Sequence, residues 1–189
     1  MSWRVLIVTC IVAAMSGLGT AGAWGQSVVY AMTGTIRSVS ATELTATSSG
    51  VTQTFSLGQK SHPSLDFDKD LREDSTPAAD FHKPDAFAVI YYYGLSTDKT
   101  AVAVKDLGPG PFEGESGTVT HFDRHSRRLT ISNAAGKTEN FIVGDKAVID
   151  TGMVVKAGRK ADPPSGSHVR VTAIPGKDAP TVVFLLLQG

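Results

Sequence analysis

The stretch Ser116–Lys146, SGTVTHFDRHSRRLTISNAAGKTENFIVGDK, repeats a pattern that occurs earlier in the chain at Thr33–Lys60, TGTIRSVSATELTATSSGVTQTFSLGQK. The offset between matching positions drifts only from 83 to 86 residues. These positions are glycines and apolar residues: Gly34 and Gly117, Ile36 and Val119, Leu44 and Leu129, Phe55 and Phe141, and Gly58 and Gly144. A second block, Asp85–Val104, aligns with Gly166–Leu185. The chain therefore reads as two copies of one module.

Apolar and polar residues alternate within each copy with a period of two, which is typical of strands with one buried face. Leu129 and Ile131 can point inward while Thr130 points outward. Turn-forming residues separate such runs, as at Asn133–Gly136. Only Lys69–Asp74 has a pattern that could form a helix, and then a single short turn. We therefore predict an all-β fold.

Proline and glycine alternate in residues 108–116, and such a stretch can neither join a central strand nor sustain a helix. We interpret it as a linker between a first module, residues 27–107, and a second module, residues 117–189. The first module carries an acidic insertion, residues 61–84, that has no counterpart in the second. The final run, Thr181–Leu187, is apolar on both faces of a strand, so we expect the two modules to pack against each other.

The order of features in the second copy carries a resemblance to a known family. A Gly-Thr-Val start is followed by LTI, a glycine turn, ENFIVGDKAVI, a variable stretch, HVRVTA and a closing strand. The chain resembles a family of small exported bacterial β-barrel modules of unknown function, often in tandem and similar to oligonucleotide/oligosaccharide-binding (OB) barrels. The resemblance implies two tandem OB-like β-barrel or β-sandwich modules. It implies no active site, because the shared pattern consists of glycines and core residues.

The first residues have the layout of a secretory signal peptide, with a short basic start and the apolar run Val5–Met15. Small residues follow, and we expect cleavage after Ala23, or else after Gly25. The apolar run is too short to span a bilayer comfortably. Removal of residues 1–23 would leave an exported chain, periplasmic or secreted, without a transmembrane anchor.

The mature chain would contain no cysteine, because Cys10 is the only one. Loss of Arg4 leaves 17 of the 18 basic residues against 18 acidic residues, a net charge of −1. This charge argues against nucleic acid as a partner. The motifs of zinc proteases, serine hydrolases and phosphate-binding loops are absent, so we interpret the protein as non-catalytic. Serine, histidine and aspartate side chains could still converge in space.

Alternating carboxylates in the acidic insertion resemble the start of a calcium loop. An EF-hand beginning at Asp66 would need glycine at the position of Leu71 and glutamate at that of Pro77, so an EF-hand is excluded. A non-standard calcium site within residues 66–80 stays open, beside the alternative of a solvated charged loop. Its candidate ligands are Asp66, Asp68, Asp70 and Asp74.

His121 and His125 lie in the basic stretch HFDRHSRR, between two apolar, threonine-rich runs. The first copy has VSATE at the equivalent place, without a histidine. A spacing of four residues brings two ligands to one side of a helix, but across a β-turn it does not ensure that they converge on one metal ion. We therefore favour a solvated hairpin turn over a metal site.

Tyr91, Tyr92 and Tyr93 are the candidate ligand-binding residues, because OB-like barrels can bind sugars or bases by stacking on exposed rings. The alternative is ordinary packing of a strand. Together these features predict an exported binding or scaffold protein whose partner is an unknown protein or polysaccharide of the cell envelope. The alternative function is a calcium- or metal-responsive exported protein that uses residues 66–80.

Overall fold

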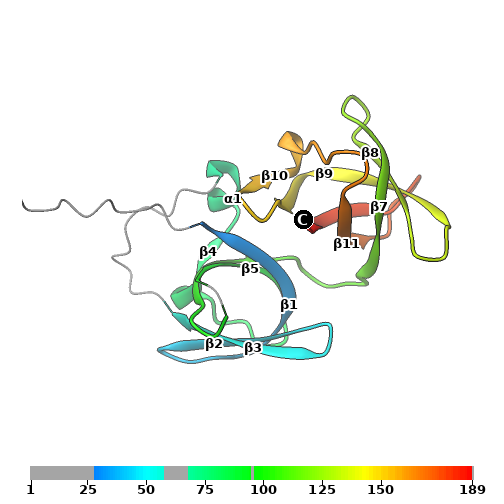
Figure 1. Cartoon of the computed structure of the whole chain (residues 1–189). Helices are drawn as coiled ribbons and strands as arrows, with labels where there is room; N and C mark the ends of the chain where they lie inside the picture. The colour runs from blue at the N-terminus through cyan, green and yellow to red at the C-terminus, as the bar shows by residue number, and fades with distance from the viewer. Residues whose placement is uncertain (1–27, 58–67, 95, 189) are drawn as a thin grey trace, which may run out of the picture.

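The computed structural model describes residues 28–57, 68–94 and 96–188. Nearly all regular structure in these ranges is β, and it forms two six-stranded sheets that follow one another along the chain (Figure 1). The prediction of an all-β fold is therefore confirmed. The predicted signal peptide, residues 1–23, lies outside the described ranges. Within those ranges, no helix has the length and apolar character needed to cross a bilayer.

Module 1 contains the first sheet. Its strands are β1 (Tyr30–Val39), β2 (Glu43–Ser48), β3 (Val51–Leu57), β4 (Thr76–Pro77), β5 (Phe87–Tyr93) and β6 (Thr100–Asp106). Strands pair in the order β3-β2-β1-β5-β6, and a parallel pairing of β3 with β6 closes the circuit. The other pairings along the circuit are antiparallel, and β4 pairs with β6 at Ala103 and Val104, beyond the parallel pairing with β3.

Module 2 contains the second sheet and repeats this circuit. Its strands are β7 (Glu113–Asp123), β8 (Arg128–Ser132), β9 (Thr138–Asp150), β10 (Val155–Ala157), β11 (His168–Ile174) and β12 (Thr181–Gln188). Here β7, β8, β9, β12 and β11 form the closed circuit, with β9 and β12 parallel. The shared arrangement is that of a small Greek-key barrel of the OB type, as predicted.

The second sheet begins earlier than the sequence indicated. Glu113–Ser116 fall within the stretch predicted as linker, but they form the start of β7 and pair with β11. Glycine at position 114 is tolerated there because this part of β7 pairs with a strand along one edge only.

The glycines that mark the sequence repeat occupy equivalent places in the two barrels. A Cβ atom on Gly34 would lie 2.9 Å from the carbonyl oxygen of Thr47, and one on Gly117 would lie 2.5 Å from that of Ser132. Both distances are too short for any side chain. β2 and β8 therefore pass over β1 and β7 at a point that only glycine allows.

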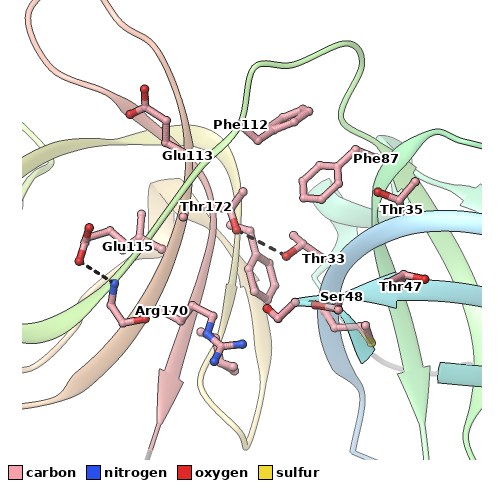
Figure 2. Close-up of a pocket in the computed structure, with 18 of the residues that line it drawn as sticks. Thr33, Thr35, Thr47, Ser48, Phe87, Phe112, Glu113, Glu115, Arg170 and Thr172 are labelled. Atoms are coloured by element: carbon pink, nitrogen blue, oxygen red, sulfur yellow. Dashed lines mark hydrogen bonds between the residues drawn. The ribbon is translucent and has the colours of Figure 1, made fainter. Parts of the chain in front are cut away.

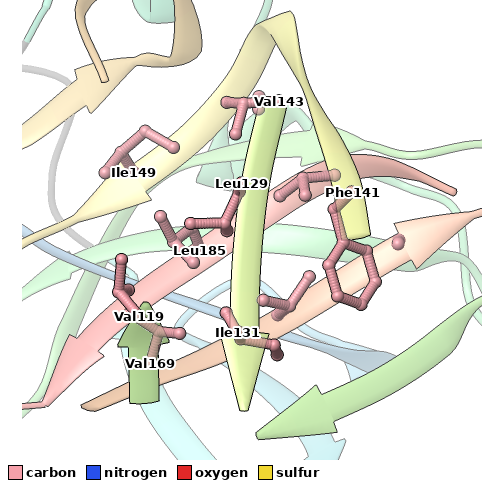
Figure 3. Close-up of a cluster of buried hydrophobic side chains, with 12 residues drawn as sticks. Val119, Leu129, Ile131, Phe141, Val143, Ile149, Val169 and Leu185 are labelled. Carbon is pink, nitrogen blue, oxygen red and sulfur yellow. The ribbon is translucent and has the colours of Figure 1, made fainter. Parts of the chain in front are cut away.

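Each barrel encloses its own apolar core. In module 2 the core includes Leu129 and Ile131, both fully buried, as the alternation predicted (Figure 3). Side chains from the other four strands of the circuit complete this core: Val119, Phe141, Val143, Ile149, Val169 and Leu185. In module 1 the equivalent core includes Ile36, Leu44, Phe55, Ile90 and Val104. The repeated alternation thus produces two similar barrel interiors.

A third apolar cluster, which we call the interface cluster, joins the modules. Its buried members from module 1 are Val29, Ala31, Leu71, Val89, Tyr91 and Ala103, and those from module 2 are Val148, Val155, Ala157 and Phe184. β12 contributes to two clusters, because Phe184 and Leu186 face module 1 while Leu185 faces the interior of module 2. This confirms that both faces of the final apolar run are buried, one in the core of module 2 and the other against module 1.

Val182 departs from the simple alternation within β12. Simple alternation along a strand would place it on the same face as Phe184, but it lies in the barrel interior with Leu185. In the pairing with β11, Thr172 lies opposite Phe184 and Ala173 lies opposite Val182, so β12 carries one extra residue. This bulge reverses the face of the residues before it.

The described part of the acidic insertion packs against both modules. Asp68 caps α1 (Lys69–Glu73), which confirms the short helical turn, and Leu71 on this helix is 1% exposed. The short helix η1 (Ala78–Asp80) follows β4, and Phe81 behind it is buried. Residues 68–81 are thus a packed segment rather than a solvated loop.

Candidate functional site

A groove of about 590 Å³ lies between the two modules (Figure 2). Its lining combines hydroxyl, aromatic and charged side chains from β1, β2, β5, β7, β11 and β12, together with the end of the linker. The hydroxyl groups come from Thr33, Thr35, Thr47, Ser48, Ser116 and Thr172, the rings from Phe87, Phe112 and Phe184, and the charges from Arg37, Glu113, Glu115 and Arg170. Both modules therefore contribute to one site.

Two hydrogen bonds hold the modules together beside the groove. The hydroxyl groups of Thr33 and Thr172 lie 3.4 Å apart, one from each module (Figure 2). The backbone N–H of Ala31 donates to Oδ2 of Asp150 at 2.7 Å. Oδ1 of the same carboxylate accepts the N–H of Gly152 at 2.7 Å. Burial raises the pKa of the Asp150 carboxyl above its usual range. The hydrogen bonds that it accepts from Ala31 and Gly152 oppose that rise.

Phe87 and Phe112 form an aromatic wall at one end of the groove. Their ring centroids are 4.4 Å apart and the rings are tilted by 32°. A second hollow of about 700 Å³ lies against the same two rings and contains the ion pair between Lys83 and Asp106, 2.8 Å long. The paired rings offer apolar surface to a ligand in either hollow.

The charged side chains of the groove differ in whether they already have a hydrogen-bond or ion-pair partner. Arg37 donates to the hydroxyl of Thr47 at 3.3 Å and lies 3.7 Å from Asp85. Among the described residues, Glu113 and Arg170 form no ion pair or side-chain hydrogen bond. The groove thus offers both signs of charge to a ligand.

The predicted tyrosines do not line this groove. Tyr91 is fully buried in the interface cluster, so its interpretation as an exposed stacking platform is wrong. Burial raises the pKa of its hydroxyl. Tyr92 packs against the rings of Tyr30 and Phe55 on β1 and β3, with centroid distances of 5.8 and 5.3 Å. Tyr93 is half-buried at the end of β5.

The predicted metal ligands within the described residues form ion pairs with basic side chains of module 2. Asp68 accepts a hydrogen bond from Lys160, Asp70 pairs with Arg159, and Asp74 pairs with Lys146. Asp66 lies outside the described residues. Within residues 28–57, 68–94 and 96–188, no three histidine, cysteine or acidic side chains lie close enough to hold a metal ion. The aspartates therefore contribute to the contact between the modules.

Residues 124–127, which include His125, form the turn between β7 and β8, as the repeat indicated, and His121 lies on β7 opposite Thr130. Asp123 accepts the N–H of His125 at 2.8 Å and the hydroxyl of Ser126 at 2.6 Å, which fixes the turn. Both histidines are exposed. Arg124 pairs with Asp162.

No family model matches the chain, and no curated protein matches it. Among solved structures, the chain is similar to Ag(I)-bound CusF at 14% identity over 41% of this chain and 99% of that one, with a TM-score of 0.32. It is similar to apo-CusF from Escherichia coli at 12% identity over 44% and 95%, with a TM-score of 0.33. It is also similar to the tetrameric p202 HIN2 at 6% identity over 86% and 95%, with a TM-score of 0.29. No site residue is transferred from these proteins.

Proposed function

We propose that this chain is an exported, non-catalytic binding protein that holds its ligand in the groove between its two OB-like modules. The groove itself carries the proposal, because its lining comes from both modules. Its volume of about 590 Å³ falls in the range of small-ligand and segment-binding sites. The sequence of residues 1–23 supports export.

The composition of the groove favours binding over catalysis. Hydroxyl groups can exchange hydrogen bonds with a polar ligand, and the Phe87 and Phe112 rings can cover its apolar parts. The candidate acid–base groups Glu113 and Glu115 lie on a strand whose other groove residues are Gly114 and Ser116, without a histidine or cysteine beside them. A ligand bridging the modules would also stabilise their contact.

Blocking the groove tests this proposal. Thr47→Trp places a large ring in the groove, while Ser132→Trp places the same ring at the equivalent position of module 2, outside the groove. We expect a ligand found in a thermal-shift panel of oligosaccharides and peptides to raise the Tm of the wild type and of Ser132→Trp but not that of Thr47→Trp. Equal stabilisation of both variants by every ligand would contradict the proposal.

A further inference from the structure

The first strand of each barrel has one open edge. The N-terminal part of β1 pairs only with β5, because the pairing with β2 begins at Thr35. The N-terminal part of β7 pairs only with β11, because the pairing with β8 begins at Thr118. The other edge of each segment has no strand beside it in the described part of the chain.

The backbone groups on these edges can be assigned from the alternation along a strand. The N–H groups of Ile36 and Val119 donate toward β5 and β11, to Ala86 and Ser167. Backbone N–H groups alternate between the two edges of a strand, so residues an odd number of positions from Ile36 or Val119 direct their N–H groups toward the opposite edge. The open edge of β1 therefore presents the N–H of Ala31, and that of β7 presents the N–H groups of its repeat equivalent, Gly114, and of Ser116.

The two edges differ in how these groups are satisfied. Ala31 donates to Asp150 of module 2, so the contact between the modules covers the edge of β1. Ser116 donates to the carboxylate of its neighbour Glu115 at 3.2 Å. No described side chain accepts from Gly114, and a Cβ atom there would have nothing within 4 Å. The edge of β7 at the rim of the groove is therefore open for a further strand.

The side chains beside this edge favour a basic partner. Glu113 and Glu115 share one face of β7, as residues two apart on a strand do, and neither forms an ion pair in the described part of the chain (Figure 2). Like charges on an edge oppose pairing with an identical edge, which argues against a second copy of the chain. Residues of opposite charge directly across from them would stabilise a strand pair.

We propose that the ligand of this protein is an extended peptide with basic residues at alternate positions, which adds a strand to the edge of β7 at Gly114 and Ser116. Its backbone exchanges hydrogen bonds with these two residues, and its basic side chains lie opposite Glu113 and Glu115. This inference rests on the proposed function, since Glu113–Ser116 line the groove.

A pair of substitutions at Gly114 isolates the backbone contribution. Gly114→Pro removes the N–H that faces the open edge, whereas Gly114→Ala keeps it, and neither change disturbs a hydrogen bond to β11. The probe is a short synthetic peptide of alternating lysine and valine, and its control has glutamate in place of lysine. Far-UV circular dichroism and the Tm of each variant report on folding.

We expect the lysine peptide to bind at least tenfold more tightly than the glutamate peptide. Gly114→Pro should weaken its binding about tenfold relative to Gly114→Ala, and Glu113→Gln combined with Glu115→Gln about fivefold. The amide resonances of Gly114 and Ser116 should shift on binding. Equal affinities for the two peptides, or for the two Gly114 variants, would overturn the inference. So would a dimer of the unliganded chain that Gly114→Pro abolishes, because the edge would then take a second copy.

The outcomes separate this inference from the proposed function. If Thr47→Trp blocks a ligand whose binding does not depend on Gly114, the groove is the site and the peptide inference fails. If the lysine peptide depends on Gly114 while no ligand responds to Thr47→Trp, the edge binds peptide and the groove proposal fails.

Discussion

Asp68 has the most buried carboxylate among the ion pairs between the modules, with a side chain 4% exposed. It accepts the N–H of Ala157 at 2.9 Å and a hydrogen bond from Lys160 at 2.9 Å, both from module 2. Burial by itself raises the pKa of this carboxyl, but these partners together lower it to about 2. One aspartate thus ties α1 to module 2.

The depressed pKa of Asp68 predicts how stability depends on pH. Its contribution is fully present above the usual aspartate pKa and is lost as the pH falls through about 2. We expect the difference in free energy of unfolding between wild type and Asp68→Asn to be about 2 kcal/mol or more at neutral pH and to narrow by about 1 kcal/mol at pH 3. Urea unfolding at both pH values measures it. A difference that does not change with pH would show that Asp68 is not ionised in this contact.

Asp150 should have the opposite pH dependence. Because its pKa is raised in the folded state, the fold takes up a proton there, and stability falls as the pH rises through the raised pKa. Asp150→Asn stays neutral and can still accept the N–H of Ala31. We expect the free energy of unfolding of the wild type, relative to this variant, to decrease as the pH rises above the usual aspartate pKa. If urea unfolding shows an increase, the carboxylate is stabilised by a positive group and the assignment is wrong.

At the scale of elements, α1 depends on a single apolar side chain. Leu71 lies in the interface cluster, whereas its neighbour Arg72 is exposed. We expect Leu71→Ala to lower the free energy of unfolding by about 3 kcal/mol and Arg72→Ala to change it by less than about 0.5 kcal/mol. Similar small effects of both substitutions in urea unfolding would mean that α1 does not pack against module 2.

The strands could be predicted from the sequence. Which side chains of each strand are buried could be predicted only in part. Leu129 and Ile131 point inward because their strand has one buried face, which alternation reveals. Val182 does not follow the alternation because a bulge adds one residue to β12, and nothing in an apolar run marks that position. Tyr91 is buried because module 2 covers it, and the sequence of one strand does not show what lies against it.

At the scale of the whole molecule, the interface cluster makes the modules depend on each other. A fragment ending at Gly110 would expose Val89 and Tyr91, and a fragment starting at Pro111 would expose Phe184. Burying each such side chain contributes about 1.5 to 3 kcal/mol. We expect both fragments to unfold at lower urea concentrations than the full chain. Unchanged midpoints for both would show two independent modules.

The groove could not be predicted from the sequence, although the repeat and the packing of the modules could be. Alignment of the copies identifies equivalent residues within each barrel, such as Gly34 and Gly117, because those positions obey the same local geometry. The groove depends on contacts between residues far apart, such as Ala31 with Asp150, 119 positions later. Asp150 has no pattern around it that indicates this partner.

An engineered disulfide between the modules can show whether they are docked as one unit with a groove between them. Thr33 and Thr172 come from different modules and their hydroxyl oxygens lie 3.4 Å apart, so cysteine side chains at these positions would come within reach of each other. The matched control pair is Thr45 and Thr130, whose hydroxyl groups contact Ser38 and Asn140 of their own modules.

In a chain with Cys10→Ser, which removes the only native cysteine, mild oxidation followed by thiol titration and mass spectrometry measures the bond. We predict that Thr33→Cys with Thr172→Cys forms an intramolecular disulfide in most molecules, while Thr45→Cys with Thr130→Cys stays reduced. If the first pair oxidises no faster than the second, the modules are not docked in this way and the groove does not exist in solution.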